Sequence, residues 1–134
     1  MARNTTRQGS QFELDVMHAL EEHGYTCLRS SGSRGAVDVV AVPEMVPRKG
    51  FPLPGWPTHV PGWLLFIQCK ISNPVIPPHE REAVQALALR AQAVPLVAYR
   101  GQHPDNARRK TILYRQLTGP GPKEWAPWAP GEDE

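Results

Sequence analysis

Two apolar segments of the chain each carry polar side chains suited to chemistry. Asp38 stands near the start of the apolar run 37–42. Gln68 and Lys70 close the second apolar run, 63–70. Runs of this length that are rich in Val, Ile, Phe and Trp are typical of buried strands. Because strand side chains alternate between faces, Gln68 and Lys70 are predicted to project on the same side. A buried strand has little reason to carry such groups unless they meet one another or a ligand.

These residue types suit a hard divalent cation. Mg²⁺ prefers oxygen ligands and keeps several waters. Asp38 offers a carboxylate, Gln68 an amide oxygen and Cys69 a main-chain carbonyl. Lys70 would stand beside the ion, where an ammonium can orient or deprotonate water or hold a phosphate. Glu13, from an upstream helix, can reach the same site directly or through a metal-bound water. Together these groups predict metal-assisted hydrolysis of a phosphodiester.

The loop 30–36, between two predicted strands, is small and basic. Ser33 and Arg34 are its candidates for binding a phosphate. The alternative for Ser33 is that a Ser-rich loop only makes turns. In the same way, Asp38 has an alternative role as an acceptor of hydrogen bonds from the glycine-containing loop.

Glu13 and Lys70 also have structural alternatives. Ser10 and Glu13 have the spacing of a capping box, which would explain Glu13 as part of a helix start. Lys70 would be a strand-end lysine that extends to water. For these two residues the functional and the structural interpretations both remain open on spacing alone.

The rest of the chain predicts the elements that position these groups. In order they are a helix 10–23, strands 25–29, 37–42 and 63–70, a helix 79–93, and strands 94–100 and 111–117. This order, αβββαββ, predicts a single-domain α/β fold with a central mixed five-stranded sheet flanked by helices. The nuclease domain would span residues 1–117, beginning with a basic N-terminal arm at 1–9. Residues 43–62 form a Pro-rich insertion with six prolines, which cannot pair as a central strand. Residues 118–134 form an extended, acidic, Trp-containing tail.

Charge and composition indicate which classes of partner the chain can bind. Residues 1–117 hold fourteen Lys and Arg against nine Asp and Glu, whereas the tail is acidic. A basic body fits a polyanionic partner. No run of eighteen apolar residues and no signal peptide is present, so we expect a cytoplasmic protein without a membrane partner, in the host cytoplasm if the source is viral. Cys27 and Cys69 are expected to be reduced core thiols, since they show no zinc-site spacing.

Several of these pieces, taken in order, resemble the PD-(D/E)XK nuclease superfamily and, within it, the archaeal-type Holliday junction resolvases (Hjc-like). The likeness covers roughly residues 7–117. Its pieces are Gly9 with Glu13, Gly24-Tyr25, 29–33, 37–41, 66–70, Gln85 and 94–100. An acid followed at a distance by x-x-Lys is weak evidence for the family when taken alone. Its agreement with the helix, the loop and the Val-Pro-Leu strand is much stronger evidence.

The resemblance implies a restriction-endonuclease-like core and a homodimeric, Mg²⁺-dependent endonuclease that cuts four-way DNA junctions, with Mn²⁺ as a substitute. The implied catalytic residues are Glu13, Ser33, Asp38, Gln68 and Lys70. The implied metal ligands are Glu13, Asp38, Gln68 and the main-chain carbonyl of Cys69. The arginines expected to contact DNA are Arg3, Arg7, Arg29 and Arg34.

The chain departs from the family pattern at two places. Position 68, usually Glu, is Gln here, which removes one negative charge from the site. The insertion 43–62 is far longer than the family's usual connection. Two other hypotheses therefore stay open. One is another PD-(D/E)XK-type endonuclease, acting in nicking, restriction or repair. The other is a non-catalytic DNA-binding module, in which Gln68 marks a decayed site.

Overall fold

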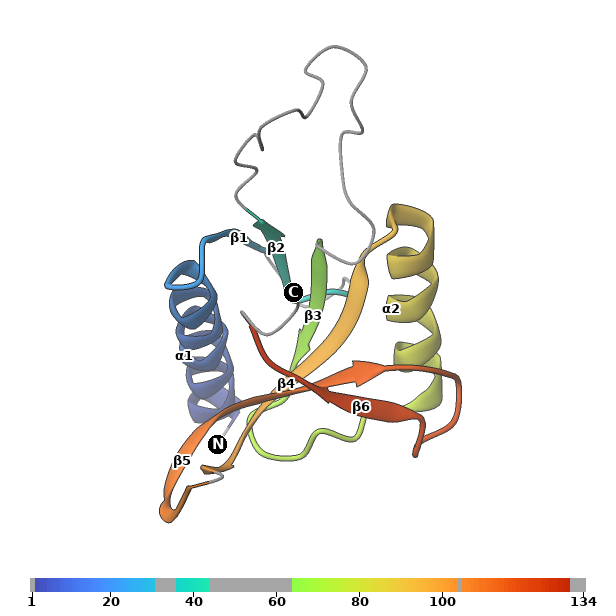
Figure 1. Cartoon of the computed structure of the whole chain (residues 1–134). Helices are drawn as coiled ribbons and strands as arrows, with labels where there is room; N and C mark the ends of the chain where they lie inside the picture. Colours follow the sequence, from blue (N-terminus) through green and yellow to red (C-terminus); the bar gives the residue numbers. More distant parts are fainter. Residues whose placement is uncertain (1, 31–35, 44–63, 104, 131–134) are drawn as a thin grey trace.

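The computed structural model describes residues 2–30, 36–43, 64–103 and 105–130, and the side chains of residues 2–7 and 107 lie outside that description. The chain forms two helices and six strands within these ranges (Figure 1). They are α1 (Ala2–Glu21), β1 (Tyr25–Arg29), β2 (Val39–Pro43), β3 (Leu65–Cys69), α2 (Pro78–Ala91), β4 (Val94–His103), β5 (Asn106–Leu117) and β6 (Trp125–Trp128).

The strands form one mixed sheet in the order β1-β2-β3-β4-β5-β6. Neighbouring strands pair antiparallel except β3 and β4, which are parallel. A parallel pair needs a crossover connection, and α2 provides it. The predicted α/β class with helices flanking a mixed sheet is confirmed, but the sheet has six strands rather than five. The sixth, β6, comes from the tail that was predicted to be merely extended, because pairing with β5 satisfies its backbone groups.

The sheet is buried on both faces, with one helix on each (Figure 1). On one face, Phe12, Val16 and Leu20 of α1 belong to a cluster with Leu65 and Ile67 of β3. The cluster on the other face combines Val84 of α2 with Val97, Val37, Ile76 and Leu117, and Phe66 packs against it. Burial on both sides explains why β3 is an almost continuous apolar run.

Helix α1 begins earlier than the sequence pattern indicated. It starts at Ala2 rather than at Ser10, so residues 2–9 are helical and do not form a separate arm. Ser10 then lies inside the helix, and the predicted capping box with Glu13 is wrong, because an interior residue has no free N–H groups to cap. The helix ends at Glu21, and Gly24 has φ 91°, in the left-handed region that glycine adopts without strain.

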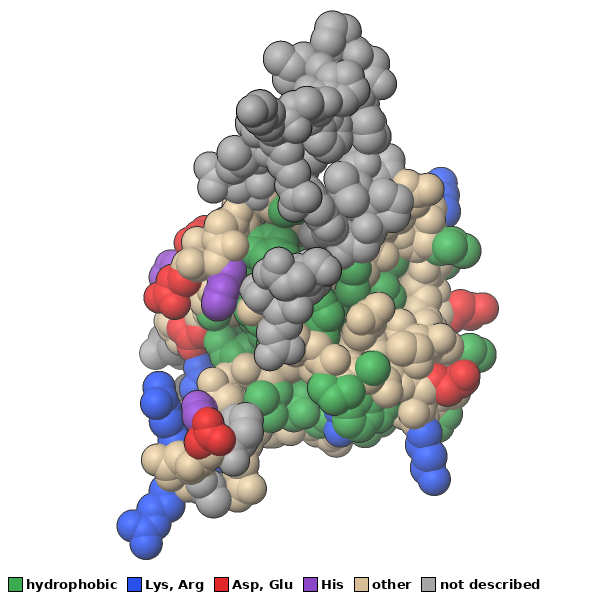
Figure 2. Space-filling view, in the orientation of Figure 1, with side chains coloured by type: hydrophobic (Ala, Val, Ile, Leu, Met, Phe, Trp, Pro, Cys, Tyr) green, Lys and Arg blue, Asp and Glu red, His purple; other side chains and the backbone are tan. Residues whose placement is uncertain are grey.

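The β4–β5 hairpin is longer than predicted. The two strands were predicted to span 94–100 and 111–117, but β4 continues to His103 and β5 begins at Asn106. Antiparallel pairing of the two strands overrides the weak strand propensity of the basic run 108–110. Figure 2 shows Lys and Arg side chains at the corner where Figure 1 places this hairpin, and residues 108–110 are exposed there.

Several predicted features lie outside the described residues. They are Ser33 and Arg34 of the loop, the Pro-rich insertion from residue 44 onward, and the side chains of Arg3 and Arg7. No helix among the described residues is long and apolar enough to cross a membrane.

A buried arginine ties α2 to the last strand. Arg81 is 6% exposed, and its Nη1 donates hydrogen bonds to the carbonyl oxygens of Gly119 at 3.0 Å and Glu124 at 3.4 Å. Within the turn that leads into β6, the N–H of Gly121 also donates to Oε1 of Glu124 at 2.7 Å. A charge this far from water persists only where such acceptors surround it.

We expect Arg81→Ala to lower the free energy of unfolding by about 2–4 kcal/mol, because two hydrogen bonds from a buried guanidinium are lost and the Gly119 carbonyl loses this donor. Urea unfolding followed by tryptophan fluorescence measures this, since Trp125 and Trp128 lie in β6. Arg90→Ala, in the exposed last turn of α2, is the matched control. Equal stability of the two variants would contradict the structural role of Arg81.

Candidate active site

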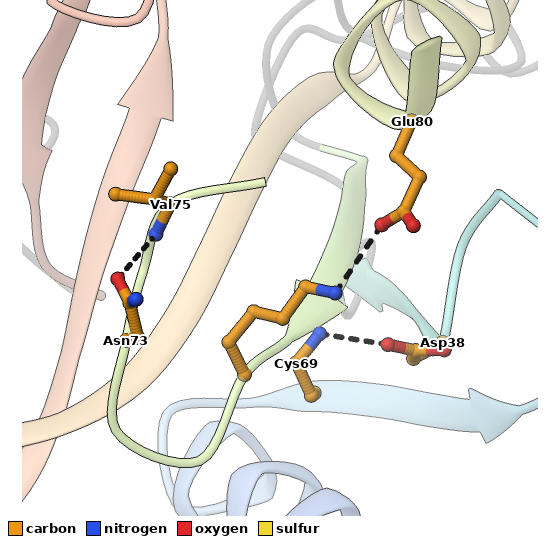
Figure 3. A network of polar contacts seen from close by, with 6 residues as sticks. Asp38, Cys69, Asn73, Val75 and Glu80 are labelled. Carbon is orange, nitrogen blue, oxygen red and sulfur yellow. Dashed lines mark hydrogen bonds and ion pairs between the residues drawn. The ribbon is translucent and has the colours of Figure 1, made fainter. Parts of the chain in front are cut away.

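Asp38 connects the start of β2 to the end of β3. Its main-chain N–H donates to the carbonyl oxygen of Ile67 at 2.9 Å, which continues the ladder between the two strands. Its carboxylate Oδ2 accepts a hydrogen bond from the main-chain N–H of Cys69 at 2.8 Å (Figure 3). It binds a residue 31 positions later, beside the predicted lysine.

Lys70 follows directly after β3 and keeps the pairing pattern of that strand. Its main-chain N–H donates to the carbonyl oxygen of Ala98 at 2.9 Å, one step beyond the parallel ladder in which Gln68 pairs with Val97. Because the alternation of side chains continues through this step, Gln68 and Lys70 share the face of the sheet that α2 covers. Gln68 is only 6% exposed and forms no hydrogen bond through its side chain among the described residues.

The lysine side chain has a partner that sequence reasoning missed. Nζ of Lys70 lies 3.2 Å from Oε1 of Glu80, in the first turn of α2, so the lysine does not simply extend to water. Both side chains are about one-third exposed. The predicted order of elements could have indicated that Glu80 lies near Lys70. The crossover helix after a parallel strand runs back along the sheet, so its first turn lies near the end of the strand it follows.

Glu13 approaches from the opposite helix. Its Oε1 lies 3.7 Å from Nε of Arg29, a loose ion pair at the end of β1. Burial raises the pKa of Glu13, the negative charge of Asp38 raises it further, and Arg29 lowers it. The charge of Asp38 therefore acts on Glu13 of α1, which stays a proposed member of the site.

The environment of Asp38 also disfavours its charge. Burial raises the pKa of this carboxyl, and the charge of Glu80 adds to the increase. The hydrogen bond from Cys69 and the charge of Lys70 act in the opposite direction without cancelling the effect. The pKa values of Glu13 and Asp38 are therefore both raised, so nearby cations compensate these carboxylates incompletely. A bound divalent cation would relieve such an electrostatic setting.

The two cysteines are free thiols, as predicted. Burial raises the pKa of the Cys69 thiol, and the charges of Asp38 and Glu13 raise it further. Burial also raises the pKa of Cys27, to about 11. Both side chains therefore stay protonated at neutral pH, and the Cys69 thiol is unsuited to act as a nucleophile or a metal ligand.

The donor set fits Mg²⁺ rather than a transition metal. Within the described residues, no group of three or more His, Cys, Asp and Glu side chains is placed to hold a metal ion. The expected ligands are instead two carboxylates, Glu13 and Asp38, with the amide of Gln68 and the main-chain oxygen of Cys69. Mg²⁺ is commonly held by one or two carboxylates while it keeps several waters. This set can hold the ion without a third acid.

We expect Asp38→Asn and Glu13→Gln each to raise the melting temperature at pH 7, by about 2–5 °C. Because the folded pKa values are raised, the native state binds more protons than the unfolded state as pH rises from about 4 through the raised values. The ionised carboxylates therefore oppose folding above that window, and the gain from neutralising them should vanish near pH 3.

Thermal unfolding of the metal-free variants at both pH values is the measurement. Asp15→Asn is the matched control, because Asp15 forms an ion pair with Arg100 and its loss should not stabilise the fold. A decrease in melting temperature for all three variants would show that the charges of Glu13 and Asp38 are compensated.

One comparison with known proteins bears on this site. The family model described as archaeal Holliday junction resolvase (Hjc) matches residues 4–51. The matched stretch contains Glu13 and Asp38, whereas Gln68 and Lys70 lie beyond it. No curated protein shows significant similarity to the chain. The match confirms the resemblance to the archaeal Holliday junction resolvases for the part of the chain that carries the two carboxylates, and it supports a Holliday junction-resolving nuclease.

Proposed function

We propose that this protein is a metal-dependent, structure-selective DNA endonuclease that resolves four-way junctions by paired cuts from a homodimer. The observation that carries the proposal is the hydrogen bond from the Cys69 N–H to the Asp38 carboxylate at the end of β3, because it binds Asp38 to the residue directly before Lys70. This bond links two distant apolar segments that carry proposed site residues, and the family match includes the two proposed acidic ligands.

Each residue has a role that follows from its surroundings. Glu13 and Asp38 are the anionic ligands, and their incompletely compensated charges favour a divalent cation. Gln68 and the carbonyl of Cys69 add neutral oxygen ligands. A bound Mg²⁺ would supply Lewis acidity toward the scissile phosphate and would lower the pKa of a coordinated water. Lys70 forms an ion pair with Glu80, and it would donate hydrogen bonds to a phosphate oxygen on which charge develops.

Branched DNA as the substrate rests on the family match together with charge. The described arginine nearest to the acids is Arg29, whose side chain is about one-third exposed and whose ion pair with Glu13 is long at 3.7 Å. Such a guanidinium can exchange its partner for a phosphate at small cost, since an exposed pair contributes little stability. Ser33 and Arg34, close to Asp38 in the sequence, remain proposed phosphate contacts, and Arg3 and Arg7 remain proposed DNA contacts.

A homodimer follows from the symmetry of the substrate. A four-way junction has approximate two-fold symmetry, and its resolution requires two matched cuts. One chain of 14.9 kDa with a single site makes one cut at a time, whereas a C2 dimer presents two sites related by the same symmetry. The exposed side of α2 offers apolar surface for such an interface, including Leu89 at 80% exposed and Leu87 at 40%.

We expect Asp38→Asn and Lys70→Ala each to lower cleavage of a labelled four-way junction by at least about 100-fold in Mg²⁺, with junction binding largely retained. Chelator should abolish wild-type cleavage. Asp105→Asn and Lys123→Ala, at exposed turn positions, are the matched controls and should cut normally. Wild-type rates for both site variants would refute the site. Faster cleavage of linear duplex than of the junction would favour a different endonuclease. If no DNA is cleaved, a non-catalytic DNA-binding module would be favoured.

The dimer is tested by mixing protomers. Light scattering of the free protein at micromolar concentration should give twice the chain mass. Heterodimers of wild-type and Asp38→Asn chains should nick one strand of a junction without the matching second cut, because only one of their two sites is active. A monomer that binds the junction as a single chain would overturn the paired-cut proposal and favour a nicking enzyme.

A further inference from the structure

Glu80 is an acidic side chain beside the site to which no role has yet been given. It lies in the first turn of α2, and its Oε1 accepts a hydrogen bond from Nζ of Lys70 at 3.2 Å. Figure 3 shows Glu80 extending from the helix toward the end of β3, on the side where Asp38 binds Cys69. Its charge is also felt by Asp38. Glu80 is therefore part of the same group of charges.

The placement of Glu80 is determined by the backbone. Pro77 and Pro78 set the start of α2, since proline is tolerated in the first turn of a helix and restricts the residue before it. Val84 and Ala88 anchor the helix through its buried face. A negative charge in the first turn is also favoured by the helix dipole. The carboxylate is thus presented to Lys70 by a packed helix and not by a loop.

Lys70 needs a negative charge beside it because the residue at position 68 is a neutral glutamine. Gln68 and Lys70 share one face of the sheet, and a glutamine brings no charge to compensate the lysine. An ammonium beside a divalent cation is repelled by it, so it requires an anionic partner to hold its position. Glu80 is the carboxylate bound to Lys70 among the described residues.

We propose that Glu80 positions Lys70 for catalysis and supplies, from α2, the negative charge that glutamine at position 68 does not bring to this side of the site. This inference rests on the proposed nuclease function and deepens it. Glu80 acts through Lys70 and is a positioning residue. It also accounts for how the chain retains Glu13, Asp38 and Lys70 while position 68 is neutral: the charge balance is met from another element.

The cleavage experiment compares Glu80→Gln with Glu82→Gln. Both residues lie near the start of α2, but Glu82 is exposed and lines a different surface, a groove of about 640 Å³ with Pro120. Glu80→Gln should lower the maximal rate of junction cleavage by about 10–100-fold and raise the Mg²⁺ concentration at half-maximal rate. Glu82→Gln should stay within about two-fold of wild type.

The decisive variant places a carboxylate at position 68 in a chain that lacks the one at position 80. Gln68→Glu in the Glu80→Gln background should restore at least about ten-fold of the lost rate, because it returns the charge to the same face. A merely structural ion pair between α2 and β3 would not be rescued in this way. Far-UV circular dichroism checks folding, because position 68 is buried. If the double variant does not fold, Glu80→Asp takes its place and should retain more activity than Glu80→Gln.

A second readout does not depend on cleavage. Calorimetric titration of each variant with Ca²⁺, a hard cation that takes oxygen ligands, measures divalent binding without DNA. The affinity should fall in Glu80→Gln, recover with Gln68→Glu, and be unchanged in Glu82→Gln. A wild-type chain that cuts no DNA would refute the proposed function, and this titration would still decide the role of Glu80. Unchanged Ca²⁺ affinity and rate in Glu80→Gln, or no recovery in the rescued form, would overturn the inference.

Discussion

The hydrogen bond from the main-chain N–H of Cys69 to the carboxylate of Asp38 is the interaction on which the site depends. It joins the residue before β2 to the last residue of β3, and both lie at one edge of the same sheet. The bond orients the acid and brings it near Lys70. It also partly compensates a carboxylate whose charge is otherwise disfavoured by burial. A main-chain donor in a strand cannot turn away, so this acid has a better-defined position than one held by a loop.

The sheet topology then brings charged groups to that edge from both faces. On one face α1 carries Glu13, and on the other the first turn of α2 carries Glu80. Each helix is held by its own apolar cluster, so the carboxylates are presented by packed elements. This arrangement lowers the stability of the fold, because partly buried carboxylates close to one another oppose folding until a cation compensates their charge. Such unfavourable groups are typical of sites that bind or react.

The family match and the geometry support different halves of the site. The match covers residues 4–51 and includes both carboxylates expected to bind the metal. The lysine half lies beyond it and is supported by the bonds that link β3 to Asp38, to β4 and to α2. The chain departs from the family pattern in this second half, at Gln68. A neutral side chain there is easier to accommodate when a neighbouring helix supplies a carboxylate.

The α/β class and the order of the first seven elements could be predicted from the residues alone, because hydrophobic periodicity and apolar runs reveal which segments are helices and which are buried strands. The sequence also indicated that Asp38 and Lys70 belong together. It did not reveal the true start of α1, the length of the β4–β5 hairpin or the strand β6, because pairing and packing with distant segments decide these. The contact between Lys70 and Glu80 was decided only by the tertiary structure. Ten positions along the chain separate the two residues, and the distance between them follows from how the crossover helix packs on the sheet.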